Sequence, residues 1–225
     1  MTRMKHSRKG GIILKKPTVK DLFQFFRDIP ANFAGSVREF SHFSSIAGAS
    51  MLLAVSIILS IFVTIPISPT LKMGIAYLAT AMLGMIFGPV LGGLTAGLGD
   101  LIKFLLKPDG IFFPGFTVNA ILGGVVYGLF FYKNRVSITR CIAAKVSVNF
   151  FLNILLNTYW LSILYGDAYL VLLVSRLWKN IVLLPFEITL LFVVLRTVSV
   201  LLPRVNVCYV RMPEAKKRHR KKLQP

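Results

Sequence analysis

Acidic side chains, and charge of either sign, are scarce in the middle of this chain. Asp and Glu number only 8 against 27 Lys and Arg among 225 residues, which gives a formal net charge of +19. Four stretches contain no charged side chain at all, namely 46–71, 73–99, 110–132 and 146–166. Each is long enough to hold a helix that crosses a bilayer, which takes about 20 apolar residues. The absence of charge excludes an ordinary soluble domain and predicts one all-α integral membrane domain.

Catalytic and metal-binding patterns are missing as well. The two cysteines, Cys141 and Cys208, have no metal-ligand spacing around them, and none of the three histidines falls in an apolar run. The sequence has no phosphate-binding loop, no HExxH motif, no Ser/His/Asp set and no pair of carboxylates in one plausible pocket. The start of the chain also lacks the long apolar core of a cleavable signal peptide. We therefore expect neither an enzyme nor a resident metal or cofactor.

The apolar pattern divides into six predicted membrane spans. We place them at 46–65, 73–87, 89–107, 112–131, 141–164 and 169–199. The second and third abut at Phe87-Gly88-Pro89, where glycine and proline require a tight turn. With the N-terminus in the cytoplasm, and the loop 133–145 counted as internal, 22 basic residues lie inside and five outside. This asymmetry predicts a multi-pass protein of the cell membrane with both termini cytoplasmic.

The two basic termini form separate segments around a membrane domain at 46–200. Residues 1–45 carry nine Lys and Arg, with phenylalanines interleaved among the charges from Pro17 onward. This composition predicts a stretch lying in the cytoplasmic membrane interface, or alternatively an ordinary helix packed under the bundle. Residues 201–225 are expected to form a basic cytoplasmic tail. Because the basic residues flank apolar spans, we expect contact with anionic lipid and no binding to nucleic acid.

A regular ladder of polar residues marks the fifth span. Asn149, Asn153 and Asn157 are four residues apart, so on an α-helix they form one stripe, which Trp160 and Tyr165 continue. An isolated asparagine in a span often only holds two helices together, and that interpretation stays open here. Three on one stripe favour a ligand-binding wall. Asparagine both donates and accepts hydrogen bonds, which suits a heterocycle with mixed polar edges.

Charged residues inside the other spans are further candidates for a binding site. A charge near the centre of a bilayer costs roughly 2.5–3.5 kcal/mol on insertion scales, so it usually faces a cavity or a partner. Arg176 and Lys179 lie in the sixth span with Glu187, which is placed to neutralise a basic neighbour. Asp100 and Lys103 are three residues apart in the third span, so they either pair with each other or line a pocket. Asn119 of the fourth span and Phe112 of the loop before it complete the predicted set.

Small residues crowd several spans at four-residue spacing. Gly93 and Gly97 form one such pair, and Gly124 and Gly128 another. This spacing lets helix backbones approach closely, so we expect packing within the bundle. The first span has a similar face, formed by Ala47, Ser50 and Ala54. That face can instead bind a second protein.

Two blocks of sequence resemble a known transporter family. The run Gly88-Pro-Val-Leu-Gly-Gly-Leu-Thr-Ala-Gly-Leu-Gly-Asp100, followed by Pro108-Asp-Gly-Ile-Phe-Phe-Pro-Gly-Phe116, resembles the S components of energy-coupling factor transporters. The run Asn153-Ile-Leu-Leu-Asn-Thr-Tyr-Trp-Leu-Ser-Ile-Leu-Tyr-Gly166 is similar to the folate-specific S component. The resemblance implies a six-helix bundle that captures its vitamin from outside. It also implies a transmembrane coupling protein (the T component), which would dock on Ala47, Ser50 and Ala54, and two ATP-binding subunits.

Folate has three chemically distinct parts that such a pocket can match. It joins a flat, amide-rich pterin to an aminobenzoyl ring and a glutamate with two carboxylates. We expect the asparagines and Asp100 to meet the pterin edge and the aromatic residues Phe112, Trp160 and Tyr165 to stack on the rings. The basic residues Lys103, Arg176 and Lys179 should face the carboxylates. The alternatives are an S component for riboflavin, thiamine or a queuosine precursor, and a membrane assembly protein that transports nothing.

Overall fold

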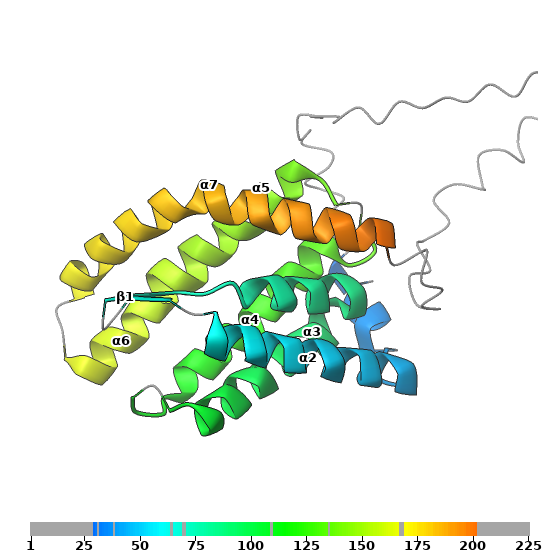
Figure 1. Cartoon of the computed structure of the whole chain (residues 1–225), viewed down its shortest axis with the longest axis horizontal. Coiled ribbons are helices and arrows are strands. Elements are labelled where there is room, and N and C mark those ends of the chain that lie inside the picture. Colours follow the sequence, from blue (N-terminus) through cyan, green and yellow to red (C-terminus); the bar gives the residue numbers. More distant parts are fainter. Residues whose placement is uncertain are drawn as a thin grey trace, which may run out of the picture.

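The computed structural model describes residues 29–30, 32–37, 39–63, 65–68, 71–108, 110–134, 136–166 and 169–201. A short helical stretch at 32–37 precedes the membrane domain. The elements that follow are α2 (Phe43–Phe62), β1 (Ile65–Ser68), β2 (Leu71–Met73), α3 (Tyr77–Leu106), α4 (Pro114–Phe131), α5 (Ile138–Ser147), the π-helix η1 (Val148–Leu156), α6 (Asn157–Tyr165) and α7 (Tyr169–Leu201). Figure 1 shows the helices gathered in one bundle, with α7 along its upper side.

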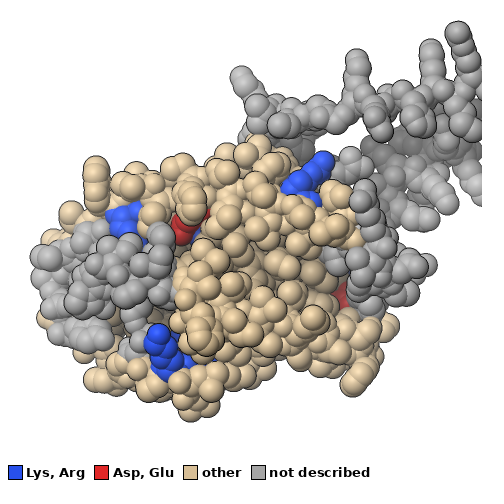
Figure 2. Space-filling view, in the orientation of Figure 1, with Lys and Arg blue, Asp and Glu red and all other residues tan. Residues whose placement is uncertain are grey.

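The described part of the chain contains five helical stretches that are long and apolar enough to cross a membrane. One of them is composite, because α5, η1 and α6 follow one another without a break from Ile138 to Tyr165. The helical membrane architecture predicted from the uncharged runs is therefore confirmed. Large apolar side chains remain exposed on most of the helices, and charged side chains occupy only small areas of the face in Figure 2. Such a surface suits contact with lipid rather than with water.

The predicted turn between the second and third spans lies inside α3. Gly88 has φ 85° and ψ −177°, a conformation outside the helical region that glycine adopts readily. A Cβ atom built on Gly92 would lie 3.0 Å from the Cα of Gly84. Residues eight apart on a straight helix are separated by about 12 Å. The chain therefore reverses at Gly88, and the two halves of α3 run side by side.

A serine from the N-terminal segment forms hydrogen bonds with the backbone on both sides of this turn. The Ser36 hydroxyl donates to the Phe87 carbonyl at 2.8 Å and accepts from the backbone N–H of Val90 at 3.0 Å and of Leu91 at 3.3 Å. These bonds satisfy backbone groups that a break in a helix leaves without partners. Ser36 and Asn32 are both buried, so residues 32–37 pack against the bundle, as in the second of the two arrangements considered above. Residues 1–28 and 202–225 lie outside the described residues.

Helices α3 and α4 pack with their backbones in contact. A Cβ on Gly124 would stand 2.6 Å from the carbonyl oxygen of Gly92, and one on Gly128 would stand 2.5 Å from the Cα of Pro89. Only glycine fits at such distances. The small-residue pairs of these two helices therefore serve packing within the bundle, as the sequence indicated. Buried side chains such as Tyr127, Phe131 and Leu191 continue the core toward α5 and α7.

Two local features were not predicted from the sequence. The membrane domain is helical as expected, but a short hairpin joins α2 to α3, in which β1 and β2 pair antiparallel with Ile65 opposite Met73. The predicted internal loop 133–145 is shorter, because α5 begins at Ile138. Lys145 lies in this helix, in agreement with the predicted span 141–164, and only 2% of its surface is exposed. It is therefore not one of the loop charges.

Candidate functional site

A cavity of about 250 Å³ opens between the helices of the bundle. Every helix from α2 to η1 contributes side chains to it. Four residues predicted from the sequence line it, namely Asp100, Lys103, Asn119 and Asn153. The other lining residues are Ser56, Ile57, Ser60, Ala76, Tyr77, Thr80, Ala96, Gly99, Ala120, Gly123, Tyr127, Lys145, Val148 and Leu152. The volume lies just below the range of about 300–1,000 Å³ that is usual for small-molecule sites.

The lining of the cavity extends along the bundle and includes two basic residues, Lys103 and Lys145. Asn119 and Tyr127 both line it from α4, eight residues apart, which corresponds to about 12 Å along the helix. Asp100, Lys103 and Asn119 form what we call the Lys103 end. Tyr127 and Lys145 form the Lys145 end, where Tyr127 belongs to the same packed cluster as Ala144 and Val148 on either side of Lys145. A long ligand with different groups at its two ends would suit this shape.

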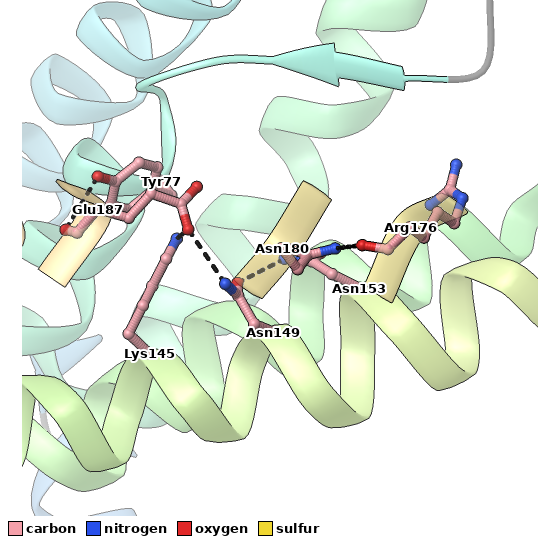
Figure 3. Close-up of polar contacts among 7 residues, drawn as sticks. All are labelled: Tyr77, Lys145, Asn149, Asn153, Arg176, Asn180 and Glu187. Atoms are coloured by element: carbon pink, nitrogen blue, oxygen red, sulfur yellow. Dashed lines mark hydrogen bonds and ion pairs between the residues drawn. The ribbon is translucent and has the colours of Figure 1, made fainter. Parts of the chain in front are cut away.

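The Lys145 end is built on a network of buried polar contacts, shown in Figure 3. The Lys145 ammonium lies 3.3 Å from Oε2 of Glu187 on α7. The same carboxylate oxygen accepts a hydrogen bond from the Asn149 amide at 3.1 Å, and Asn153 donates to the Asn149 side-chain oxygen at 2.9 Å. The expectation that Glu187 neutralises a basic neighbour is thereby confirmed. The network also fixes Asn153, which reaches the cavity wall.

Tyr77 holds Lys145 and Glu187 from the other side. Its hydroxyl donates to the backbone carbonyl of Glu187 at 3.2 Å, and the Lys145 ammonium lies 3.5 Å from the centre of its ring. A cation over an aromatic face is attracted by the negative charge density of the ring. Lys145 is thus held by a carboxylate and an aromatic ring, in a position that permits little movement.

The predicted asparagine ladder runs across a change of helix type. Asn149 and Asn153 lie in η1, whereas Asn157 is the first residue of α6. A π-helix turns by a smaller angle per residue than an α-helix, and π-helical segments are frequent at functional sites. Asn149 and Asn153 remain in contact across this segment, and Asn153 lines the cavity. Asn149 is buried behind it, and Asn157 is not part of the lining.

The Lys103 end carries a second, more exposed ion pair. Lys103 lies 3.7 Å from Asp100, whose other carboxylate oxygen accepts a hydrogen bond from the Thr117 hydroxyl at 3.0 Å. Both interpretations of this pair therefore hold, because the two side chains neutralise each other and also line the cavity. Thr117 comes from α4, so the contact ties the two helices together at this end.

Aromatic side chains surround the neighbouring part of the bundle. The Trp160 indole donates to the side-chain oxygen of Asn119 at 3.3 Å, which fixes an amide of the cavity wall. Its ring packs against Phe113, with centroids 5.5 Å apart. Phe112 is 42% exposed and its ring contacts Phe104, with centroids 5.1 Å apart, outside the cavity lining. Trp160 therefore does not line the described cavity itself, but it fixes the side chain of Asn119, which does.

The predicted residues of α7 lie apart from the cavity lining. Arg176 is buried with 8% of its surface exposed, and its backbone carbonyl accepts a hydrogen bond from the Asn180 side chain at 2.9 Å. Figure 3 shows it at the opposite end of the polar cluster from Glu187. Arg176 precedes Glu187 on α7 by eleven residues, which corresponds to about 16 Å along a helix axis. Lys179 is half-buried. The side chain of Tyr165 lies outside the described part of the structure.

Sequence reasoning missed Tyr77, Tyr127 and Lys145, although two of them carried a signal. Lys145 stands four residues before Asn149, so the polar ladder extends one step toward the N-terminus. Tyr127 stands eight residues after Asn119, with Gly123 midway, and all three line the cavity from one face of α4. Tyr77 gave no such signal, because its role depends on contacts with two distant helices. Among the residues that the structure describes, no cluster of His, Cys, Asp or Glu is suited to hold a metal ion.

Comparison with known proteins places this arrangement in a family. The family model "ECF transporter, substrate-specific component" matches residues 44–195. A folate transporter FolT from Clostridium novyi (strain NT) is 35% identical over 143 residues, covering 64% of this chain and 83% of the relative. A FolT from Leuconostoc mesenteroides subsp. mesenteroides is 28% identical over 124 residues, covering 52% and 67%. A crystal structure of FolT bound with folic acid matches with a TM-score of 0.63 and 34% identity, over 67% of this chain and 92% of that one. The chain therefore belongs to the substrate-specific components of ECF transporters, a family of transport proteins rather than enzymes.

Proposed function

We propose that this chain is the membrane-embedded subunit that captures folate for an ATP-driven ECF importer. The observation that carries the proposal is the likeness to FolT bound with folic acid, because nearly the whole of that chain is matched at 34% identity. The cavity supports it independently, since its lining extends along the bundle and carries polar side chains at both ends. Folate is likewise elongated, with a pterin at one end and two carboxylates at the other.

The proposed arrangement of folate assigns its carboxylates to the Lys103 end. Lys103 lines the cavity there. Arg176 and Lys179 lie in the first third of α7, before Glu187, which belongs to the Lys145 end. A guanidinium can bind a carboxylate through two parallel hydrogen bonds. The sequence predicts a contact of Asp100 with the pterin, but its contact with Lys103 favours a role in orienting that ammonium.

The remaining predicted residues divide into those that line the cavity and those that hold the lining residues in place. Asn153 and Asn119 present amides to the cavity, while Asn149 and Trp160 hold these two amides from behind. Stacking by Phe112 and Tyr165 and a contact with Asn157 remain predictions for the bound state. A rigidly held amide discriminates better between ligands than a mobile one, because its geometry is fixed before binding.

The proposed topology has six crossings and both termini in the cytoplasm. It counts the halves of α3 on either side of Gly88 separately, in agreement with the spans expected from the sequence. Residues 1–45 and 201–225 are then cytoplasmic segments flanking a binding domain at 46–200. The placement of basic residues supports this orientation in the cell membrane.

The proposed partners are a transmembrane coupling protein and two ATP-binding subunits. Ala47, Ser50 and Ala54 are exposed along α2, and the Ser50 hydroxyl donates to the Ile46 carbonyl of its own helix at 2.9 Å. Ser50 therefore presents little polarity to a partner. Small exposed residues let another helix approach closely in a membrane, which supports this face as the docking site of the coupling protein.

Thermal stability of the detergent-purified chain tests the proposal. A ligand that binds only the folded state raises the melting temperature, and the shift grows with the logarithm of the ratio of its concentration to its dissociation constant. Folate should raise it, whereas riboflavin and thiamine at equal concentration should not. A shift with a different vitamin would identify that vitamin, and not folate, as the ligand. No shift with any of them, from protein shown to be folded, would contradict the transport function.

A further inference from the structure

One buried polar atom at the Lys145 end is not used by the fold. Tyr127 lines the cavity with 1% of its surface exposed, and its hydroxyl has no hydrogen-bond partner among the residues that the structure describes. A buried hydroxyl without a partner is destabilising, because it has lost its hydrogen bonds to water. Proteins keep few such groups, and each calls for an explanation. Its position in the cavity wall suggests a partner that arrives with the ligand.

The neighbours of Tyr127 define what that partner must offer. The Lys145 ammonium can only donate hydrogen bonds, and it is fixed by Glu187 and by the Tyr77 ring. The Tyr127 hydroxyl can also donate. Tyr127 interacts electrostatically with Glu187 and Tyr77, the two residues that hold Lys145, so the two donors lie in the same part of the cavity. This end therefore suits a ligand group that presents hydrogen-bond acceptors.

The charge at this end selects a neutral group over a carboxylate. Lys145 is already balanced by Glu187 at 3.3 Å, and a carboxylate from the ligand would be repelled by that side chain. A keto oxygen or a ring nitrogen accepts hydrogen bonds without adding charge. In folate, these acceptors lie on the pyrimidinone edge of the pterin, at the far end from the glutamate.

Resting on the folate-binding function proposed above, we infer that the pterin occupies the Lys145 end and that the Tyr127 hydroxyl donates to its pyrimidinone edge. Lys145 supplies the second donor, and Glu187 is a positioning residue that acts through Lys145. Asn153, held by Asn149, borders the same ring. The glutamate then extends toward the Lys103 end. None of these assignments follows from the asparagine ladder alone, because it does not include Tyr127.

The experiment measures the affinities of three ligands for wild type and for Tyr127→Phe, which removes only the hydroxyl. The ligands are folate, pteroic acid, which lacks the glutamate, and p-aminobenzoylglutamate, which lacks the pterin. Tyr127→Phe should weaken folate and pteroic acid by the same factor, about tenfold for one hydrogen bond. It should leave p-aminobenzoylglutamate unchanged. Tyr159→Phe is the matched control, because Tyr159 is 51% exposed and should affect none of the three.

The outcomes separate this inference from the function on which it rests. The unliganded Tyr127→Phe protein should melt no lower than wild type, because the change removes an unpaired buried group. An unchanged folate affinity in that variant would overturn the inference, and so would an equal loss for p-aminobenzoylglutamate. Wild type that binds folate but not pteroic acid would overturn it too. Wild type that does not bind folate would refute the proposed function itself.

Discussion

Replacing Glu187 by glutamine removes the negative charge beside Lys145 while keeping the size of the side chain. The two charged groups are 3.3 Å apart, and their side chains are 16% and 2% exposed. At an effective dielectric constant of about 20, this separation corresponds to about 5 kcal/mol of attraction. Desolvation of both groups offsets part of it. Because the variant leaves one charge buried without its counterion, we expect the free energy of unfolding to fall by about 3–5 kcal/mol.

The pair at the other end of the cavity provides the control. Lys103 and Asp100 are 3.7 Å apart and 38% and 20% exposed, so Lys103→Gln should cost at most about 1 kcal/mol. Unfolding by sodium dodecyl sulfate in mixed micelles, followed by the fluorescence of the two tryptophans, measures both variants on one scale. Combining Lys145→Met with Glu187→Leu should recover most of the loss, because no charge is then left unbalanced. A Glu187→Gln protein that loses no more stability than Lys103→Gln would refute this reasoning.

Four further substitutions test other parts of the molecule. Ser36→Ala should lower the free energy of unfolding by about 1–3 kcal/mol, since it leaves backbone groups of the α3 turn unpaired, and an unchanged unfolding midpoint would contradict this role. Gly128→Ala should cost about 1–3 kcal/mol in the same assay, because its Cβ would stand 2.5 Å from the Cα of Pro89, and wild-type stability would rule out the close packing. Arg176→Ala should raise the dissociation constant of folate about tenfold while changing that of pteroic acid little, and equal losses would exclude a contact with the glutamate. Ala54→Trp should preserve folate binding by the isolated chain but abolish uptake by the assembled transporter, and normal uptake would exclude this docking face.

The features that could be predicted from the sequence are those that depend on neighbouring residues. Runs without charge located the membrane helices, because the bilayer core excludes charge over a fixed length. Gly88 and Pro89 located the reversal within α3, since this pair cannot continue a helix. Glycines at four-residue spacing indicated the packing of α3 against α4. Each of these signals lies within a short stretch of sequence and needs no knowledge of the rest of the fold.

The site was only partly predictable because its chemistry depends on residues distant in sequence. Lys145 looks like the flank of a cytoplasmic loop until Glu187, far along the chain, is seen beside it. The prediction of the asparagine ladder assumed α-helical spacing. The segment η1 is a π-helix instead, and no rule of local composition predicts that change. Tyr127 became a candidate only when its hydroxyl proved to be buried and unpaired among the described residues.

The contact between Ser36 and the α3 turn bears on how the chain assembles during synthesis. Ser36 precedes Phe87 by 51 residues, so it leaves the ribosome well before its partner exists. The segment that contains it can adopt its final position only after α2 and α3 as far as Leu91 have been made, because Val90 and Leu91 also bond to Ser36. Fixation of the N-terminal segment therefore follows synthesis of the turn. A chain shortened to begin just before Asn32 would keep the hydrogen bonds between Ser36 and the turn. A chain that begins after Ser36 would insert a hairpin whose turn lacks them.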